Sequence, residues 1–288
     1  MEEILDNNKL MKKFRKYKLN NQSILDFGGI YFKKNKIRKK YNYPKITIIT
    51  VVKNDEKKIQ KTIESVLKQK FNNLEYIVID GNSNDKTLKI IKKFNNKIHI
   101  WISKKDKNLW DAMNTGILLS KGDIIGILNS GDYFYKNAIK TVSNYFKNHK
   151  IDFLFGAVKK TRVFHRFEPQ KIYYRLNIYP SHSCGFFIKR KAQKKVGLYD
   201  SSFKHCSDLD LIYRMIVKKK LKGLPTKKNE VLGSFDVHGI SSKEPFYKMY
   251  FYEMLVRYKN GQNFLYLIFL FILKILNKLK NVLFLNKK

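Results

Sequence analysis

The sequence predicts an α/β protein in which helices flank a mostly parallel sheet. Apolar runs of strand length show no polar alternation, which is typical of strands buried on both faces. Between these runs lie segments whose apolar residues recur at helical spacing. The alternation of the two kinds of segment favours a parallel sheet with right-handed crossovers.

The predicted strands are short and rich in β-branched residues, and they cover residues 45–52, 74–80, 97–103 and 122–129. Three helices are expected between them, over residues 55–69, 86–94 and 111–120. In the first helix one face carries Ile59, Ile63, Val66 and Leu67. Ser83 or Asp85 is a candidate N-cap of the second helix, since both residue types accept hydrogen bonds from free backbone N–H groups.

The two ends of the chain differ from this pattern. Residues 1–43 are basic and polar without a clear period, and we expect an extension outside the main fold. Residues 264–273 are apolar, but Lys274 ends the run after about ten residues, whereas a membrane-spanning helix needs about 20. Apolar and lysine positions then alternate, which is typical of a helix lying in a membrane interface. The alternative is a helix docked on the domain or on another subunit.

The chain is strongly basic, with 60 Lys+Arg against 23 Asp+Glu and a formal net charge of +37. This imbalance favours an anionic partner, whether nucleic acid, acidic lipid or a phosphorylated substrate. Lysine excess of this kind also follows from an AT-rich genome. Because no nucleic-acid-binding module accompanies the basic segments, we expect no specific nucleic-acid partner.

Few residues are suited to disulfide or zinc chemistry. Cys184 and Cys206 are the two cysteines, which fits a reducing cytoplasmic setting. His182 and His205 lie near them in sequence, but the spacings are not those of structural zinc motifs. The N-terminus opens with acids and no apolar segment, so we expect no signal peptide. The predicted location is the cytoplasm, at the inner face of the cell membrane.

Polar and acidic residues follow each predicted strand. They are residues 53–55, 80–85, Asp106 with Asp111, and 129–132. In open parallel sheets ligands bind beyond the carboxyl ends of the strands. Turn formation explains each loop singly, but it does not explain why an acid-poor chain places carboxylates after every strand. The pattern therefore favours a binding site at this edge.

Several motifs, taken together in their order and spacing, resemble the family 2 glycosyltransferases of the GT-A fold. They are TIITVVKND, TIESVLKQ, EYIVIDGNSNDKT, DAMNTGI, KGDIIGILNSGDYF and GLYDSSFKHCSDLDL, and the resemblance covers about residues 44–242. Enzymes that build bacterial surface polysaccharides are the most similar members. The resemblance implies inverting transfer of a sugar from a nucleotide donor, expected to be UDP-linked, to a saccharide or lipid-linked saccharide.

The resemblance implies a set of donor-binding residues: Thr50, Val52, Asn54, Asp80, Asp111, Asn114, Ser130 and Gly131. Asp80 would accept a hydrogen bond from an imide N–H of the base, and Asp85 is implied to be structural. Asp132 matches the last acid of the D-x-D motif and would hold Mg²⁺ or Mn²⁺ against the donor diphosphate. His238 is a further candidate for the metal. The chain departs from the family where Gly81, Asn129 and Gly131 replace acids.

The second half of the motif set concerns the acceptor. The stretch PSHSCGFFIKR implies that His182 and Phe186 lie near the acceptor or donor sugar. The segment HCSDLDL implies that Asp208 is the general base that takes the acceptor proton, although Ser207 stands where Glu is usual. The alternative is that Asp208 caps a helix. Asp210 and Arg214, at i,i+4, are expected to pair on that helix or to clamp a loop.

The implied organisation has four parts: the extension 1–43, a nucleotide-sugar half 44–150, an acceptor half 151–242 and a helical extension 243–288. Two other function classes stay open at this stage. One is a non-catalytic basic protein that binds nucleic acid. The other is a sugar-nucleotide-binding scaffold that has lost its chemistry through the acid-to-glycine changes.

Overall fold

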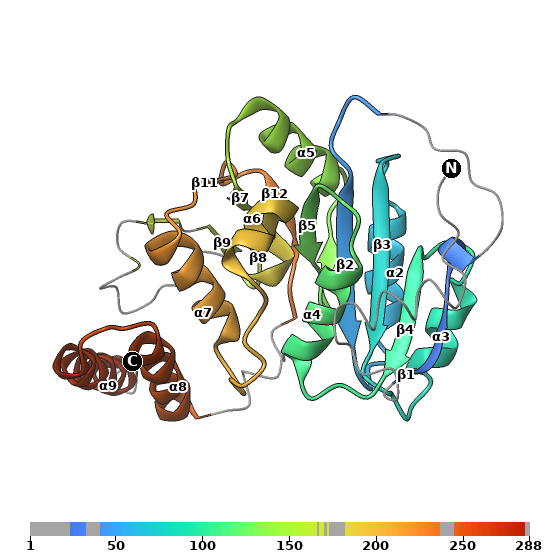
Figure 1. Ribbon diagram of the computed structural model, residues 1–288. Helices are drawn as coiled ribbons and strands as arrows, with labels where there is room; N and C mark the ends of the chain where they lie inside the picture. Colours follow the sequence, from blue (N-terminus) through green and yellow to red (C-terminus); the bar gives the residue numbers. More distant parts are fainter. Residues whose placement is uncertain are drawn as a thin grey trace. The chain divides into compact units, whose positions relative to one another are not determined.

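The computed structural model describes residues 24–32, 41–165, 167–169, 172, 182–236 and 245–285 (Figure 1). The chain forms two compact units. The first comprises Met1–Phe167, Pro180–Leu198 and Leu221–Asp236. The second comprises Glu168–Tyr179, Tyr199–Lys220 and Val237–Lys288.

The first unit is built on an eight-stranded mixed sheet. In spatial order its strands are β1 (Ile24–Gly28), β4 (Ile100–Lys104), β3 (Leu74–Asp80), β2 (Ile46–Val52), β5 (Ile124–Ile127), β10 (Phe186–Lys189), β7 (Phe153–Phe155) and β11 (Gly223–Pro225). The central strands β4, β3, β2 and β5 are parallel. Their carboxyl ends therefore lie at one edge, and the predicted α/β class is confirmed.

Helices cover both faces of this sheet (Figure 1). On one face, apolar residues of α2 (Ile59–Leu67), α3 (Thr87–Lys93) and α5 (Ala138–Asn148) share a buried cluster with alternate residues of β2 and β3. On the other face α4 (Leu109–Leu119) packs against β2 and β3. A Cβ on Gly116 of α4 would lie 2.3 Å from a methyl carbon of Ile49, so this helix approaches the sheet closely only without a side chain there. A further helix, α6 (Arg190–Val196), follows β10.

The same unit contains a second sheet, which includes the strand that follows the loop after β5. Its strands are β6 (Tyr133–Phe134), β12 (Val231–Ser234), β8 (Ala157–Lys159) and β9 (Val163–Phe164), in this order. Because β12 pairs with β6, the residues after β12 lie beside the residues before β6. Short 3₁₀ turns occur at Ile30–Phe32 (η2) and Ser183–Gly185 (η4).

The second unit is helical in its described residues. Helix α7 (Ser207–Tyr213) continues into a π-helical turn, Arg214–Lys218 (η5), and α8 (Phe246–Lys259) and α9 (Phe264–Leu285) follow. The expected pair is confirmed, since Arg214 Nη2 lies 2.8 Å from Asp210 Oδ2. Asp210 also accepts a hydrogen bond from Asn260 Nδ2 at 2.7 Å, which joins α7 to the end of α8. Within the described residues, no helix combines the length and apolar character that crossing a membrane requires.

The predicted elements of the main sheet are all present, with shifted ends. Helix α2 begins at Ile59 rather than at residue 55, because the N–H groups of Lys58 and Ile59 donate to the carbonyl of Asp55 in a preceding turn. Helix α4 begins earlier than expected because Asn108 caps it, accepting hydrogen bonds from the N–H groups of Trp110 and Asp111.

Three expectations are corrected. Part of residues 1–43 belongs to the main sheet, because β1 pairs antiparallel with β4. The C-terminal helical segment is not a separate extension, since it shares a compact unit with α7. Lys274 does not face outward in the way a headgroup-binding lysine would. It is buried and paired with Glu253 of α8, because two oppositely charged groups compensate one another between the packed helices.

The close approach at Gly116 gives a test of this packing. We expect Gly116→Ala to lower the free energy of unfolding by about 1–3 kcal/mol, because overpacking outweighs the better helix propensity of alanine. Denaturant unfolding measures the change. In an Ile49→Ala background, which lacks the carbon that the new Cβ would meet, Gly116→Ala should cost less, and strictly additive effects of the two substitutions would contradict the contact.

Candidate active site

The loop after β5 is held by its backbone. Gly131 adopts φ +92°, a conformation that side chains rarely tolerate, and a Cβ there would lie 3.1 Å from Asp236 Oδ2. The side chain of Thr62, on α2, fixes the turn through two hydrogen bonds to its backbone. Its hydroxyl accepts from the N–H of Gly131 at 3.1 Å and donates to the carbonyl of Asp132 at 2.8 Å. The turn therefore presents Asp132 in one orientation.

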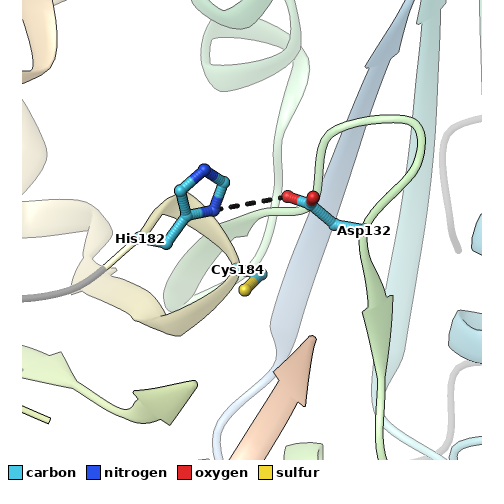
Figure 2. Close-up of side chains that lie close together, drawn as sticks. All are labelled: Asp132, His182 and Cys184. Carbon is cyan, nitrogen blue, oxygen red and sulfur yellow. Dashed lines mark ion pairs between the residues drawn. The ribbon is translucent and has the colours of Figure 1, made fainter. Parts of the chain in front are cut away.

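Asp132 is a deeply buried acid with one unsatisfied oxygen. The residue is 2% exposed, and its Oδ1 accepts the N–H of Asp236 at 2.9 Å. Its Oδ2 makes no hydrogen bond within the described residues and lies 3.4 Å from Nδ1 of His182 (Figure 2). Burial raises the pKa of Asp132 to about 7; the Asp236 N–H opposes this rise, and the Asp236 charge adds to it.

His182 faces Asp132 as a neutral imidazole. Its ring stacks on Phe235, with centroids 4.2 Å apart and planes within 6°. Burial, helped by the charge of Lys160, lowers the pKa of His182 to about 4, so the ring carries no charge at neutral pH. A neutral ring nitrogen is a metal ligand and a hydrogen-bond partner for a carboxyl group.

Cys184 completes a group of three possible ligands. Among the described residues, Asp132, His182 and Cys184 form the one cluster whose ligand atoms all lie within 4.8 Å of one another (Figure 2). Burial raises the pKa of the Cys184 thiol, so the sulfur is protonated and is a weak ligand. The carboxylate and the neutral imidazole do fit a divalent cation, because the buried Oδ2 has no other partner within the described residues.

Asp80 ends β3, and serine hydroxyls orient its carboxylate. The residue is 1% exposed. Ser103 donates to Oδ2 at 2.6 Å and Ser83 donates to Oδ1 at 2.5 Å. Ser83 also accepts the N–H of Asn54, which adopts a left-handed φ of 51°. The loops after β2 and β3 are thus joined at the position of Asp80.

Asp111 lies on the first turn of α4 and is held by the end of β4. Lys104 Nζ lies 3.1 Å from Asp111 Oδ2 and also pairs with Asp106. Burial raises the pKa of Asp106 to about 6, with Lys104 opposing this rise and the Asp111 charge adding to it. The last two residues of β4, Ser103 and Lys104, thus contact Asp80 and Asp111 respectively, at the carboxyl end of the strand.

The loop carrying Asp132 is tied to the same edge of the sheet. Ser130 donates its hydroxyl hydrogen to Asp55 Oδ2 at 2.6 Å, and Asp55 follows Asn54 after β2. Hydrogen bonds therefore connect the loops after β2, β3 and β5, and β4 adds Asp111. The three acids that the sequence singles out, Asp80, Asp111 and Asp132, share the carboxyl edge of the parallel strands.

Other predicted site residues have structural partners. Thr50 is buried within β2 and accepts from Tyr76 Oη at 3.0 Å, while Val52 and Asn114 are buried at the end of β2 and on α4. Phe186 stacks on Phe155 within the sheet, with centroids 5.2 Å apart. Their roles toward donor or acceptor stay predictions. His238 lies outside the described residues.

Asp208 lies in the second unit, on the first turn of α7. Its Oδ1 accepts the N–H of Leu209 at 2.9 Å. The N-cap position belongs to Cys206, which makes no side-chain cap hydrogen bond, and the Asp208 carboxylate instead accepts one of the first-turn N–H groups. The charge of Asp208 adds to the burial that raises the pKa of Tyr199. Its role as general base stays a prediction.

Sequence reasoning missed Asp236, which lies beside Asp132. Asp236 follows β12, donates its N–H to Asp132 and pairs through its carboxylate with Lys58. The signal was present, because Asp236 is another acid directly after a strand in an acid-poor chain. The pairing of β12 with β6 brings Asp236 to the site. This pairing joins segments about 100 residues apart, and no local sequence pattern predicts it.

The arrangement of the central sheet and its helices is a fold of the GT-A type. The structure is similar to that of residues 1–349 of Staphylococcus aureus TarS in complex with UDP-GlcNAc, with a TM-score of 0.58, 18% identity, and coverage of 74% of this chain and 65% of that chain. It is also similar to the mannosyltransferase PcManGT of Pyrobaculum calidifontis in complex with GDP-Man and Mn²⁺. Here the TM-score is 0.55, the identity 13% and the coverage 85% and 68%. At these identities the likeness concerns the fold.

The family model of glycosyl transferase family 2 matches residues 47–207, more than half of the chain, and the chain belongs to this family. A glycosyltransferase of Rickettsia typhi is 28% identical over 188 residues, which are 60% of this chain and 59% of the relative. The poly(ribitol-phosphate) β-N-acetylglucosaminyltransferase TarP of Staphylococcus aureus is 33% identical over 117 residues, 39% of this chain and 36% of TarP. The matches thus span less than two thirds of either relative. The resemblance and the enzyme class inferred from the motifs are confirmed.

Asp106 gives the candidate site a pH-dependent stability. Its pKa in the folded protein, about 6, lies above the ordinary value of 3.8, so between these values the folded state binds more protons than the unfolded state. The free energy of unfolding should therefore fall as pH rises from about 4 to 6, by roughly 2–3 kcal/mol. Denaturant unfolding of the wild type and Asp106→Asn at several pH values measures this difference.

We expect the Asp106→Asn protein to lack this part of the pH dependence. Its free energy of unfolding should therefore increase relative to that of the wild type as pH rises. Asp123→Asn, at an exposed position, is the matched control for the loss of one carboxylate. Parallel pH profiles of the wild type and Asp106→Asn would contradict the assignment.

Proposed function

We propose that the protein is an inverting, metal-dependent glycosyltransferase. In this proposal it moves a sugar from a UDP-linked donor to a saccharide or lipid-linked saccharide acceptor during surface polysaccharide synthesis. One observation carries the proposal. Asp80, Asp111 and Asp132 share one sheet edge, and the unpaired Oδ2 of buried Asp132 faces the neutral ring of His182.

The choice of UDP is supported by Asp80 and by the structural neighbours. Two serine hydroxyls fix the Asp80 carboxylate at the strand end, and such a carboxylate can accept from an imide N–H of uracil. The structure of TarS, which shares the fold, is a complex with UDP-GlcNAc. Asn54 is proposed to contact the nucleotide, because its N–H binds Ser83 beside Asp80. Asp111 and Asn114, which both lie on α4, are proposed to contact the ribose and the sugar.

Asp132 and His182 are the residues that would hold Mg²⁺ or Mn²⁺. When bound, the cation supplies positive charge that neutralises the leaving diphosphate. The chain prepares the position in three ways. The N–H of Asp236 orients Oδ1, stacking on Phe235 holds the imidazole, and the absence of a side chain on Gly131 leaves room for the neighbouring Asp236 side chain. His182 is thereby proposed as a metal ligand rather than as an acceptor contact.

Asp208 is proposed as the general base. Inversion needs a carboxylate that takes the proton of the acceptor hydroxyl as the oxygen attacks the anomeric carbon from the face opposite the leaving diphosphate. Asp208 is suited to this role because α7 presents it at a helix start rather than within the core. In this proposal the reaction takes place in the cytoplasm, at the inner face of the cell membrane.

Removing the Asp132 carboxylate should abolish transfer. We expect Asp132→Ala to lower kcat/KM at least about 100-fold, because the cation and the diphosphate lose their shared contact. The protein should also lose the rise in Tm that UDP with Mn²⁺ gives the wild type. Asp123→Ala, which removes an exposed acid of the same unit, is the control. Undiminished transfer by folded Asp132→Ala protein would exclude the proposed role of Asp132, whereas a wild type that binds UDP-sugar without transferring it would favour a binding protein.

Asp208→Asn separates donor binding from chemistry. We expect kcat to fall about 10²–10⁴-fold with the KM for the UDP-sugar nearly unchanged, because only proton removal is lost. Steady-state kinetics with a saccharide acceptor measures the split. Asp200→Asn removes an acid of the same unit that pairs with Lys259 and should change neither constant strongly. An unaltered kcat for Asp208→Asn would exclude its role as base.

A further inference from the structure

The hairpin of α8 and α9 exposes an apolar surface that the transfer reaction does not use. Every strongly exposed large hydrophobic residue of the described chain lies on these two helices, apart from Leu25. On α9 they recur at helical spacing as Leu265, Ile268, Phe269, Ile272, Leu276 and Leu279. On α8 a second stripe consists of Tyr247, Phe251, Leu255 and Tyr258. We call these two stripes together the hairpin face.

The exposed residues of the hairpin face are distinct from the apolar residues through which α9 packs against α8. Helix α9 already buries its opposite side, through Leu267 and Leu270, against Met254 of α8. Leu265 is 74% exposed and Phe269 57% exposed, far above ordinary core residues. A contiguous apolar stripe of this size on a soluble surface marks a contact with a partner or a membrane.

Buried charges fix the direction of the hairpin face. Glu253 of α8 pairs with Arg257 and with Lys274 of α9, and all three are buried between the helices. Lys274 is the charge that interrupts the apolar run of α9, and this pairing turns it inward. The exposed side of α9 consequently stays apolar on both sides of position 274.

The charges that do lie outside are of one sign. Glu253 is the one acid in the sequence from Pro245 to the end, and it is buried. Lys248 and Lys278 are exposed on the two helices, and Lys259, at the end of α8, pairs with Asp200 outside them. Lys278 lies over the ring of Phe246, 5.9 Å from its centroid, at the border of the apolar stripes. A surface with apolar and aromatic residues, a lysine border and no exposed acid complements an anionic lipid bilayer.

We propose that the hairpin face binds the surface of an anionic lipid bilayer, with the apolar stripes of α8 and α9 inserted among the headgroups. A second copy of the chain is disfavoured as the occupant, because each copy would bring the same basic border and a formal net charge of +37. No described helix is long and apolar enough to span the bilayer, so the contact is with its surface. The inference deepens the proposed location at the membrane and rests on no step of the transfer reaction.

The test is cosedimentation of the full chain with vesicles of phosphatidylcholine alone or mixed with phosphatidylglycerol. We expect partitioning at least about tenfold stronger onto the mixed vesicles, weakening as salt rises from 0.1 M, where charges are screened over about 10 Å. This comparison needs no variant. Absence of binding, or equal binding to both vesicles, would overturn the proposal.

Variants locate the contact on the hairpin face. Leu265→Glu combined with Ile272→Glu should reduce partitioning at least about tenfold, because two inserted apolar side chains become charges of the same sign as the lipid. Leu25→Glu is the matched control, since Leu25 is 59% exposed but lies on β1 of the other unit. Equal loss in both proteins, or no loss in the double variant, would contradict the assignment.

Two further measurements separate this proposal from its alternatives. Sedimentation velocity without lipid should show a monomer for the wild type. A wild-type dimer that becomes monomeric with Ile272→Glu would assign the face to a second copy instead. Asp132→Ala should keep vesicle binding, while the hairpin double variant should keep transfer to a soluble acceptor. Vesicle binding and sugar transfer are therefore measured independently, so the failure of one proposal can be told from the failure of the other.

Discussion

The candidate site depends on one constraint, the common direction of strands β4, β3, β2 and β5. Parallel pairing brings their carboxyl ends to a single edge, so acids far apart in sequence meet there. Carboxylates gathered in this way repel one another, and the protein compensates locally. Serine hydroxyls donate hydrogen bonds to Asp80, and Lys104 forms ion pairs with Asp106 and Asp111. Asp132 accepts a hydrogen bond from a backbone N–H.

Compensation is least complete at Asp132, and this defines the chemistry of the edge. Its Oδ2 is buried without a hydrogen bond within the described residues, opposite an imidazole that burial keeps neutral. A buried acid left in this state carries a raised pKa, and an arriving cation would relieve the desolvation that causes it. Gly131, which looks like an ordinary turn former, leaves room for the Asp236 side chain, whose backbone N–H binds the Asp132 carboxylate.

The second unit shows how a similar pairing of charges serves a different purpose. The buried group of Glu253, Arg257 and Lys274 fastens α9 to α8, and Asp210 joins α7 to the end of α8 through Asn260. Burying these charges removes the polar interruptions from the outer side of the hairpin. The apolar hairpin face is thus a consequence of where the charged residues pair, and not only of how many apolar residues the segment contains.

The sequence by itself determined the α/β class, the four parallel strands, the helices between them and the acids after each strand. These follow from local periodicity and from composition, which act over a few residues. The sequence also identified the glycosyltransferase family through the order of its motifs. Tertiary structure alone decided that β1 joins the sheet, that Asp236 lies against Asp132, and that Lys274 points inward. Each of these depends on a contact between segments distant in the chain, whose partner no local pattern specifies.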